Sequence, residues 1–167
     1  MTIFGSGRGK VFPSQRAGSL LNPLRRLIQS PTRMVRRMGL ALTDRVLEIG
    51  SGPGYFSRAV ATAVPHGSLV LFDIQKAMLE LARKRWSDLA NIEFTQGDAS
   101  SLPDRDRCIA EAARVLVRNC NITFAESRRD SGFIPINKLK ALAEKHSLEF
   151  SERRGFGWAY TARFRKT

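Results

Sequence analysis

The chain has 167 residues, of which 43% are hydrophobic and 26% charged, with 13 glycines and 7 prolines. This length and composition predict an ordinary globular core and exclude disordered, collagen-like and coiled-coil chains. The formal net charge of +13 favours an anionic partner such as nucleic acid or a membrane surface.

Cysteine and histidine usage argues against a disulfide framework and against a metal site. The only candidates are Cys108, Cys120, His66 and His146, and none of them forms a ligand-like pair with another. No apolar run approaches the roughly 20 residues that span a bilayer. The first ten residues also lack the apolar segment of a secretory signal. We therefore expect no metal and a cytoplasmic location.

The N-terminal segment is basic. Residues 1–43 contain eight arginines and lysines and no acidic residue. Asn22-Pro23 and Ser30-Pro31 each resemble a helix N-cap followed by proline, and Gly39 is placed to end the second helix. We expect a basic helical extension over residues 1–43 and the main domain over residues 44–167.

From residue 45 onward, strand and helix patterns alternate. Helices are predicted over 56–64, 77–86, 104–117 and around 139–143. Strands are predicted over 46–49, 68–73, 92–96, 121–125, 148–152 and 158–165. Helical crossovers imply a parallel sheet, and the last two strands form a closing antiparallel hairpin. The expected class is α/β, with a Rossmann-like, mostly parallel sheet that has helices on both faces.

A glycine-rich turn follows the first of these strands, in the segment Val46–Tyr55. The dinucleotide pattern GxGxxG fails here because Tyr55 stands where the third glycine is needed. Pro53 removes a backbone N–H, and Glu48 adds a carboxylate, so the turn is poorly suited to a pyrophosphate. An adenosine ligand that carries positive charge instead of phosphate fits better.

Two further acidic residues end the next two strands. Asp73 lies 19 residues beyond Gly54, where a carboxylate can accept hydrogen bonds from both ribose hydroxyls. Asp98 could accept from an adenine amine. Because the carboxyl ends of parallel strands share one edge of the sheet, these groups describe an adenosine site.

Four motifs, in order and spacing, carry a resemblance to a known family. They are VLEIGSGPGYFS (46–57), LVLFDIQKAMLELARKR (69–85), IEFTQGDASSLP (92–103) and EAARVL (111–116). The chain resembles the class I S-adenosylmethionine-dependent methyltransferases, and within them the branch that includes the ubiquinone and menaquinone biosynthesis enzymes.

The resemblance implies S-adenosylmethionine as cofactor and a role for each matching residue. The glycines would border the methionine part with Glu48 nearby, Asp73 would bind the ribose, and Ile74 would pack on the adenine. The implied cofactor-binding set is Glu48, Gly50, Ser51, Gly52, Gly54, Asp73, Ile74, Asp98 and Ala99. No catalytic residue is assigned, because alignment of acceptor, methyl and sulfur can suffice.

The sequence also departs from this family. After Leu102-Pro103 it passes directly to a helix, so the usual intervening strand is absent, and the glycines that follow RVL are missing. Six strands are predicted where the family sheet has seven. A lost interior strand would leave its neighbours unpaired, which would favour a homodimer or swapped elements.

The leading hypothesis is methyl transfer to a small or lipophilic acceptor, with peripheral membrane contact through residues 22–39. One alternative is an RNA methyltransferase, which the net charge favours. Nucleic acid is the less favoured partner, because no base-flipping motif or aromatic-interleaved basic patch is present. Another alternative is a truncated, non-catalytic module that only binds the cofactor.

Overall fold

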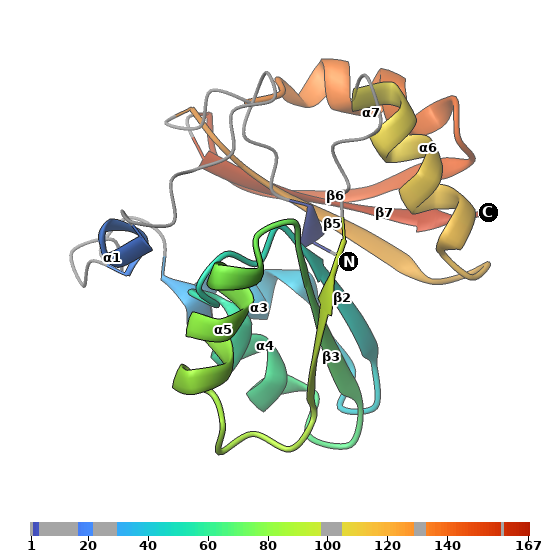
Figure 1. Ribbon diagram of the computed structural model, residues 1–167. Coiled ribbons are helices and arrows are strands. Elements are labelled where there is room, and N and C mark those ends of the chain that lie inside the picture. The colour runs from blue at the N-terminus through green and yellow to red at the C-terminus, as the bar shows by residue number, and fades with distance from the viewer. Residues whose placement is uncertain (1, 4–16, 22–29, 98–104, 129–132, 158) are drawn as a thin grey trace. The chain divides into compact units, whose positions relative to one another are not determined.

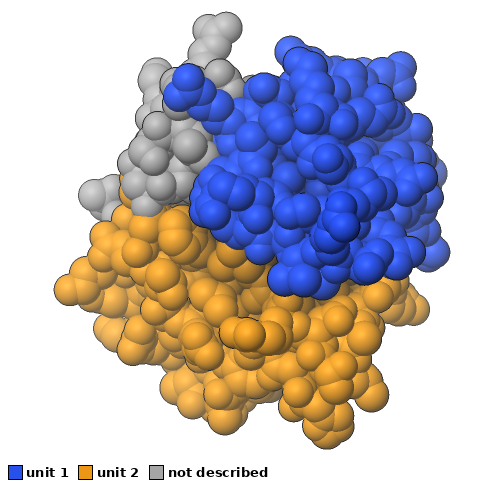
Figure 2. Space-filling view, turned by 90° about the vertical axis from the view of Figure 1, so that its right-hand side faces the viewer, with its two compact units in different colours: residues 1–10, 99–167 blue, residues 11–98 orange. Residues whose placement is uncertain are grey.

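A computed structural model describes residues 2–3, 17–21, 30–97, 105–128, 133–157 and 159–167. The chain divides into two compact units. One consists of residues 11–98, and the other combines residues 1–10 with residues 99–167. They are called the 11–98 unit and the 99–167 unit below (Figure 2).

The 11–98 unit contains a three-stranded parallel sheet. Its strands are β2 (Arg45–Ile49), β3 (Ser68–Asp73) and β4 (Ile92–Gln96), with β3 in the centre. Leu69 of β3 pairs with Val46 on one side and with Ile92 on the other, and all three side chains are buried. The sequence predicted these three strands to within one residue.

Helices α3 (Pro31–Met38), α4 (Ser57–Ala63) and α5 (Lys76–Arg85) lie together on one side of this sheet (Figure 1). A short helix, α1 (Ala17–Leu20), precedes them. The Ser30 side chain caps α3 by accepting a hydrogen bond from the Arg33 N–H, and Gly39 ends the helix in the left-handed conformation. The second predicted N-terminal helix is therefore confirmed. The first, beginning at Asn22-Pro23, lies outside the described residues.

The 99–167 unit contains a sheet of β5 (Asn121–Ser127), β7 (Ala159–Lys166) and β6 (Leu148–Phe156), with β7 in the centre and antiparallel to both neighbours. The predicted closing hairpin is confirmed. Helices α6 (Arg105–Val115) and α7 (Ile136–Glu144) pack on this sheet.

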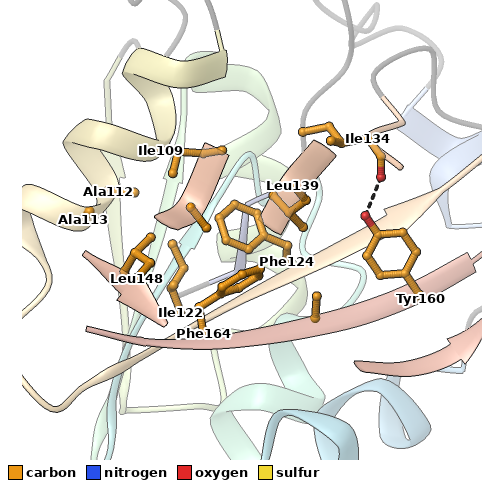
Figure 3. Packing of buried hydrophobic residues seen from close by; sticks show 12 residues of the cluster. Ile109, Ala112, Ala113, Ile122, Phe124, Ile134, Leu139, Leu148, Tyr160 and Phe164 are labelled. Atoms are coloured by element: carbon orange, nitrogen blue, oxygen red, sulfur yellow. Dashed lines mark hydrogen bonds between the residues drawn. The ribbon is translucent and has the colours of Figure 1, made fainter. Parts of the chain in front are cut away.

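Aromatic side chains form the centre of the 99–167 core (Figure 3). Phe124 and Phe164 meet edge to face with centroids 5.6 Å apart, and the Tyr160 hydroxyl donates a hydrogen bond to the Ile134 carbonyl. The buried members are Ile109, Ala112, Ala113, Ile122, Phe124, Ile134, Leu139, Ala143, Leu148, Tyr160, Ala162 and Phe164. This core holds the unit together without any part of the glycine-rich turn.

A two-residue strand, β1 (Thr2–Ile3), was not predicted from the sequence. It pairs in parallel with β5, with Thr2 opposite Thr123 and Ile3 opposite Phe124. Between β4 and α6 the structure describes only Gly97, so the expected loss of a strand there stays a prediction. The expectation that the neighbours of the lost strand are left unpaired is wrong for β5 at Thr123 and Phe124, which pair with β1. The homodimer stays a prediction.

Two negative findings concern only the part of the chain that the structure describes. None of its helices is long and apolar enough to cross a bilayer. None of its His, Cys, Asp and Glu side chains gather in threes that could hold a metal ion. The domain boundary expected at residue 43 remains a prediction.

Candidate functional site

The candidate site is built on the loop between β2 and α4. Gly50, Gly52 and Gly54 all have positive φ, at 70°, 55° and 74°, and the loop therefore turns in a way that residues with side chains rarely adopt. The Gly50 N–H donates to the Phe72 carbonyl at 2.8 Å. The Gly54 N–H donates to the Ser51 carbonyl at 3.1 Å. These bonds give the loop a defined shape against β3.

The carboxylate of Asp73, at the end of β3, holds two backbone segments. Its Oδ2 accepts from the Gly52 N–H at 2.8 Å, and its Oδ1 accepts from the Gln75 N–H at 2.9 Å. The residue is only 7% exposed. Because each carboxylate oxygen can accept two hydrogen bonds, these contacts leave room for ligand hydroxyls.

Glu48 lies beneath the loop on β2 and is 2% exposed. Its Oε2 accepts a hydrogen bond of 2.8 Å from the Ser57 hydroxyl. Burial raises the pKa of Glu48 to about 7, the Ser57 hydrogen bond opposes this, and the nearby Asp73 charge adds to it. Near neutral pH this carboxyl can therefore respond to a bound cation by ionising.

Trp86, the residue after α5, contacts the far end of the glycine loop. Its indole Nε1–H donates to the Gly54 carbonyl at 2.9 Å. The neighbouring Arg85 donates from Nη1 to the Pro53 carbonyl at 3.4 Å. The side chains of two residues at the end of α5 thus bind two consecutive carbonyls of the loop, those of Pro53 and Gly54.

The end of β4 approaches the same place. The Gly97 N–H donates to the Asp73 carbonyl at 3.1 Å, and Gln96 Nε2 donates to the Ile74 carbonyl at 3.2 Å. Ile74 is 37% exposed, as a residue that packs on a ligand should be. The predicted contacts Asp98 and Ala99 lie outside the described residues.

These residues fit an S-adenosylmethionine-like ligand better than a pyrophosphate. Ser51 Oγ is buried and has no hydrogen-bond partner among the described residues, which identifies an unused polar group in the loop. Two buried carboxyls, Glu48 and Asp73, adjoin the loop and favour a cationic ligand. The structure thus brings together every described member of the predicted set.

Sequence reasoning assigned no role to Ser57 and did not relate Trp86 to the glycine loop. Ser57 lies inside the first motif, and its spacing of nine residues from Glu48 could have indicated the contact. Trp86 is 32 residues from Gly54, and nothing in the local pattern relates the two.

Comparisons with known proteins agree with this geometry. A family profile described as "Methyltransferase domain" matches residues 46–121. The ubiquinone/menaquinone biosynthesis C-methyltransferase of Pseudomonas savastanoi pv. phaseolicola is 42% identical over 72 residues, which are 41% of this chain and 28% of that protein. A malonyl-[acyl-carrier protein] O-methyltransferase of Halalkalibacterium halodurans is 34% identical over 74 residues, 44% of this chain and 27% of that protein. The chain thus spans little more than a quarter of these relatives.

Solved structures extend the similarity to nearly the whole chain at the level of fold. A SAM-dependent methyltransferase from Aquifex aeolicus has a TM-score of 0.77 at 14% identity and covers 94% of this chain and 100% of its own. Magnesium protoporphyrin IX methyltransferase from Synechocystis PCC 6803, with bound SAM, has a TM-score of 0.65 at 14% identity over 96% and 87% of the two chains.

Residues 46–121 match a methyltransferase domain, and the fold is that of the class I S-adenosylmethionine-dependent methyltransferases, so the expected α/β class is confirmed. S-adenosylmethionine is the methyl donor of this family. The motif region of the chain is partially homologous to the ubiquinone/menaquinone biosynthesis C-methyltransferases.

Proposed function

We propose that the chain binds S-adenosylmethionine at residues 48–54 and 73–74 and transfers its methyl group to a small-molecule acceptor. The observation that carries this proposal is the double contact of Asp73, which joins the glycine loop to the start of α5. A carboxylate held in this way is preorganised to accept hydrogen bonds from ribose hydroxyls. Because its side chain is already ordered, binding costs less conformational entropy.

The remaining residues of the site have complementary tasks. Glu48 and Asp73 supply negative charge beside the loop, Ile74 offers an apolar surface, and Ser51 offers an unused hydroxyl. When bound, the cofactor supplies an electrophilic methyl group on a sulfonium. The protein then has to orient donor and acceptor in line and exclude water, which needs no general base in the described part of the chain.

The small-molecule acceptor is supported by the names of two curated relatives, a ubiquinone/menaquinone biosynthesis C-methyltransferase and a malonyl-[acyl-carrier protein] O-methyltransferase. The RNA alternative is supported by the net charge of +13. The two proposals predict different acceptors and the same cofactor.

The first experiment is calorimetric titration with S-adenosylhomocysteine, the product form of the cofactor. We expect binding by the wild type and a loss of at least roughly tenfold in affinity for Asp73→Asn, since one charge-assisted acceptor is removed. Glu93→Gln is the matched control, because Glu93 is an exposed carboxylate of the same unit. Absence of wild-type binding would refute the proposal.

Turnover distinguishes the candidate functions. Release of S-adenosylhomocysteine with a quinol acceptor such as reduced menadione would support the small-molecule enzyme. Release only with RNA would support the RNA alternative. Tight cofactor binding without release in any of these assays would instead support the non-catalytic module.

A further inference from the structure

The indole of Trp86 fixes one peptide of the glycine loop. It donates to the Gly54 carbonyl at 2.9 Å, and a Cβ atom at position 54 would lie only 2.6 Å from Trp86 Nε1. The indole and the loop are therefore in direct contact, and glycine is the residue that permits this contact.

The indole is itself held in place by cationic side chains. The guanidinium carbon of Arg85 lies over the ring at 4.6 Å from its centroid, and that of Arg58 at 5.4 Å. Arg58 is in turn paired with Asp88 at 3.0 Å. The indole N–H therefore has a defined direction and does not swing freely.

Fixing the Gly54 carbonyl also fixes the next N–H. In a trans peptide the carbonyl and the following N–H point in opposite directions, and the described chain has no cis peptide. With the Gly54 carbonyl bound to Trp86, the Tyr55 N–H points away from Trp86. The indole therefore fixes the plane of the Gly54-Tyr55 peptide, in the same loop whose Gly52 N–H is bound by Asp73.

We infer that Trp86 is a positioning residue for cofactor binding, acting through the Gly54-Tyr55 peptide. The inference rests on the proposed cofactor function. It predicts that loss of the indole N–H alone weakens cofactor binding, whereas an equal loss of stability elsewhere in the 11–98 unit does not.

The test compares two variants by titration with S-adenosylhomocysteine and by thermal unfolding. Trp86→Phe keeps an aromatic ring beside Arg58 and Arg85 but loses the N–H donor. Asn91→Ala removes the amide that donates to the Ala61 and Val64 carbonyls at the other end of α4. We expect the Kd to rise roughly 3- to 10-fold for Trp86→Phe. For Asn91→Ala we expect a lower Tm and a Kd within about twofold of the wild type.

A spectroscopic measurement keeps the inference testable if Trp86→Phe folds poorly. The chain has two tryptophans, so Trp158→Phe leaves Trp86 as the only indole fluorophore. We expect its emission to change on titration with S-adenosylhomocysteine and to saturate at the calorimetric Kd.

The outcomes separate the two proposals. Wild-type binding combined with an unchanged Kd for Trp86→Phe, or with an unresponsive Trp86 emission, would overturn this inference and leave the cofactor function standing. A wild type that does not bind would overturn the cofactor function and this inference with it.

Discussion

The Oδ2 atom of Asp73 accepts a 2.8 Å hydrogen bond from the backbone N–H of Gly52, 21 residues earlier in the chain. This bond ties the loop after β2 to the end of β3. The carboxylate that the family motif assigns to ribose is thus also a structural brace of the glycine loop. Stability and cofactor affinity should therefore both depend on it.

Asp73→Ala should lower the free energy of unfolding by about 2 to 3 kcal/mol, because two part-buried N–H groups, on Gly52 and Gln75, lose their acceptors. Denaturant unfolding without cofactor measures this. Asp88→Asn is the control, since the exposed Arg58–Asp88 pair should be worth less than about 1 kcal/mol. A change in the free energy of unfolding below about 0.5 kcal/mol for Asp73→Ala would contradict a structural role of Asp73 in the glycine loop.

Glu48 should make the stability of the cofactor-free protein depend on pH. Because burial raises the pKa of Glu48 from 4.5 to about 7, the folded state holds its proton more tightly than the unfolded state does. The contribution of Glu48 to the free energy of unfolding is therefore most favourable below pH 4.5, and this contribution is lost as the pH rises to about 7. Above pH 7 the free energy of unfolding is lower by about 3 kcal/mol than it is below pH 4.5, because Glu48 is then ionised in a buried place.

Glu48→Gln removes this titration and keeps an acceptor for the Ser57 hydroxyl. We expect Glu48→Gln to be more stable than the wild type by about 2 to 3 kcal/mol at pH 8 and by less than about 1 kcal/mol at pH 5. Unfolding curves of both proteins at the two pH values give the difference. An equal difference at both values would mean that Glu48 has no raised pKa.

Gly54→Ala should be strongly destabilising. The residue has a φ of 74°, and an added Cβ would lie 2.6 Å from Trp86 Nε1, so both backbone strain and a clash oppose it. We expect a loss of at least about 2 kcal/mol and weaker cofactor binding. Gly18→Ala in α1 is the control, because nothing lies within 4 Å of its Cβ position, and it should be neutral or stabilising.

Gly97→Ala tests the contact between β3 and the residue that follows β4. Its Cβ would lie 2.3 Å from Cζ of the Phe72 ring, so either the ring or the backbone has to move. We expect a cost of about 1 to 3 kcal/mol. The double variant with Phe72→Leu should recover part of the cost of the glycine substitution, and the thermodynamic cycle measures this coupling. If the two substitutions have strictly additive effects on the free energy of unfolding, there is no steric conflict between residue 97 and the Phe72 ring.

Membrane contact through residues 22–39 stays a prediction. The structure of α3 favours electrostatic binding to a membrane surface over insertion of an apolar helix face. Met34, Val35 and Met38 are buried, so the exposed part of this helix offers arginines and no apolar face for insertion. We expect binding to anionic vesicles that is lost at high salt and weakened roughly 10- to 30-fold by Arg36→Gln with Arg37→Gln.

The control for the vesicle experiment removes the same charge elsewhere. Lys138→Gln with Lys145→Gln changes two exposed lysines at and after α7 in the 99–167 unit. This double variant should bind vesicles nearly as well as the wild type. Equal weakening by both pairs would assign the binding to net charge instead of to α3.

Much of the fold could be predicted because its signals are local. The strands β2 and β3 are short and largely apolar, β3 ends at Asp73, and Gly50 and Gly97 directly follow β2 and β4. Ser30-Pro31 and Gly39 mark the two ends of α3. Backbone preferences and the alternation of apolar residues act over a few neighbours, so a single sequence is enough to see them. The strand β1 escaped prediction because two residues are too few to show a period.

The order of the motifs and the failure of the dinucleotide pattern at Tyr55 can be read from the amino-acid sequence, which also predicts a set of residues around the glycine loop. The folded chain alone shows that Asp73 braces Gly52, that Trp86 binds the Gly54 carbonyl, and that β1 pairs with β5. These are contacts between residues 21 to more than 100 positions apart. These contacts form because the packing of helices against the sheet brings the two groups within hydrogen-bond distance. A local sequence pattern does not predict the distance between residues so far apart in the chain.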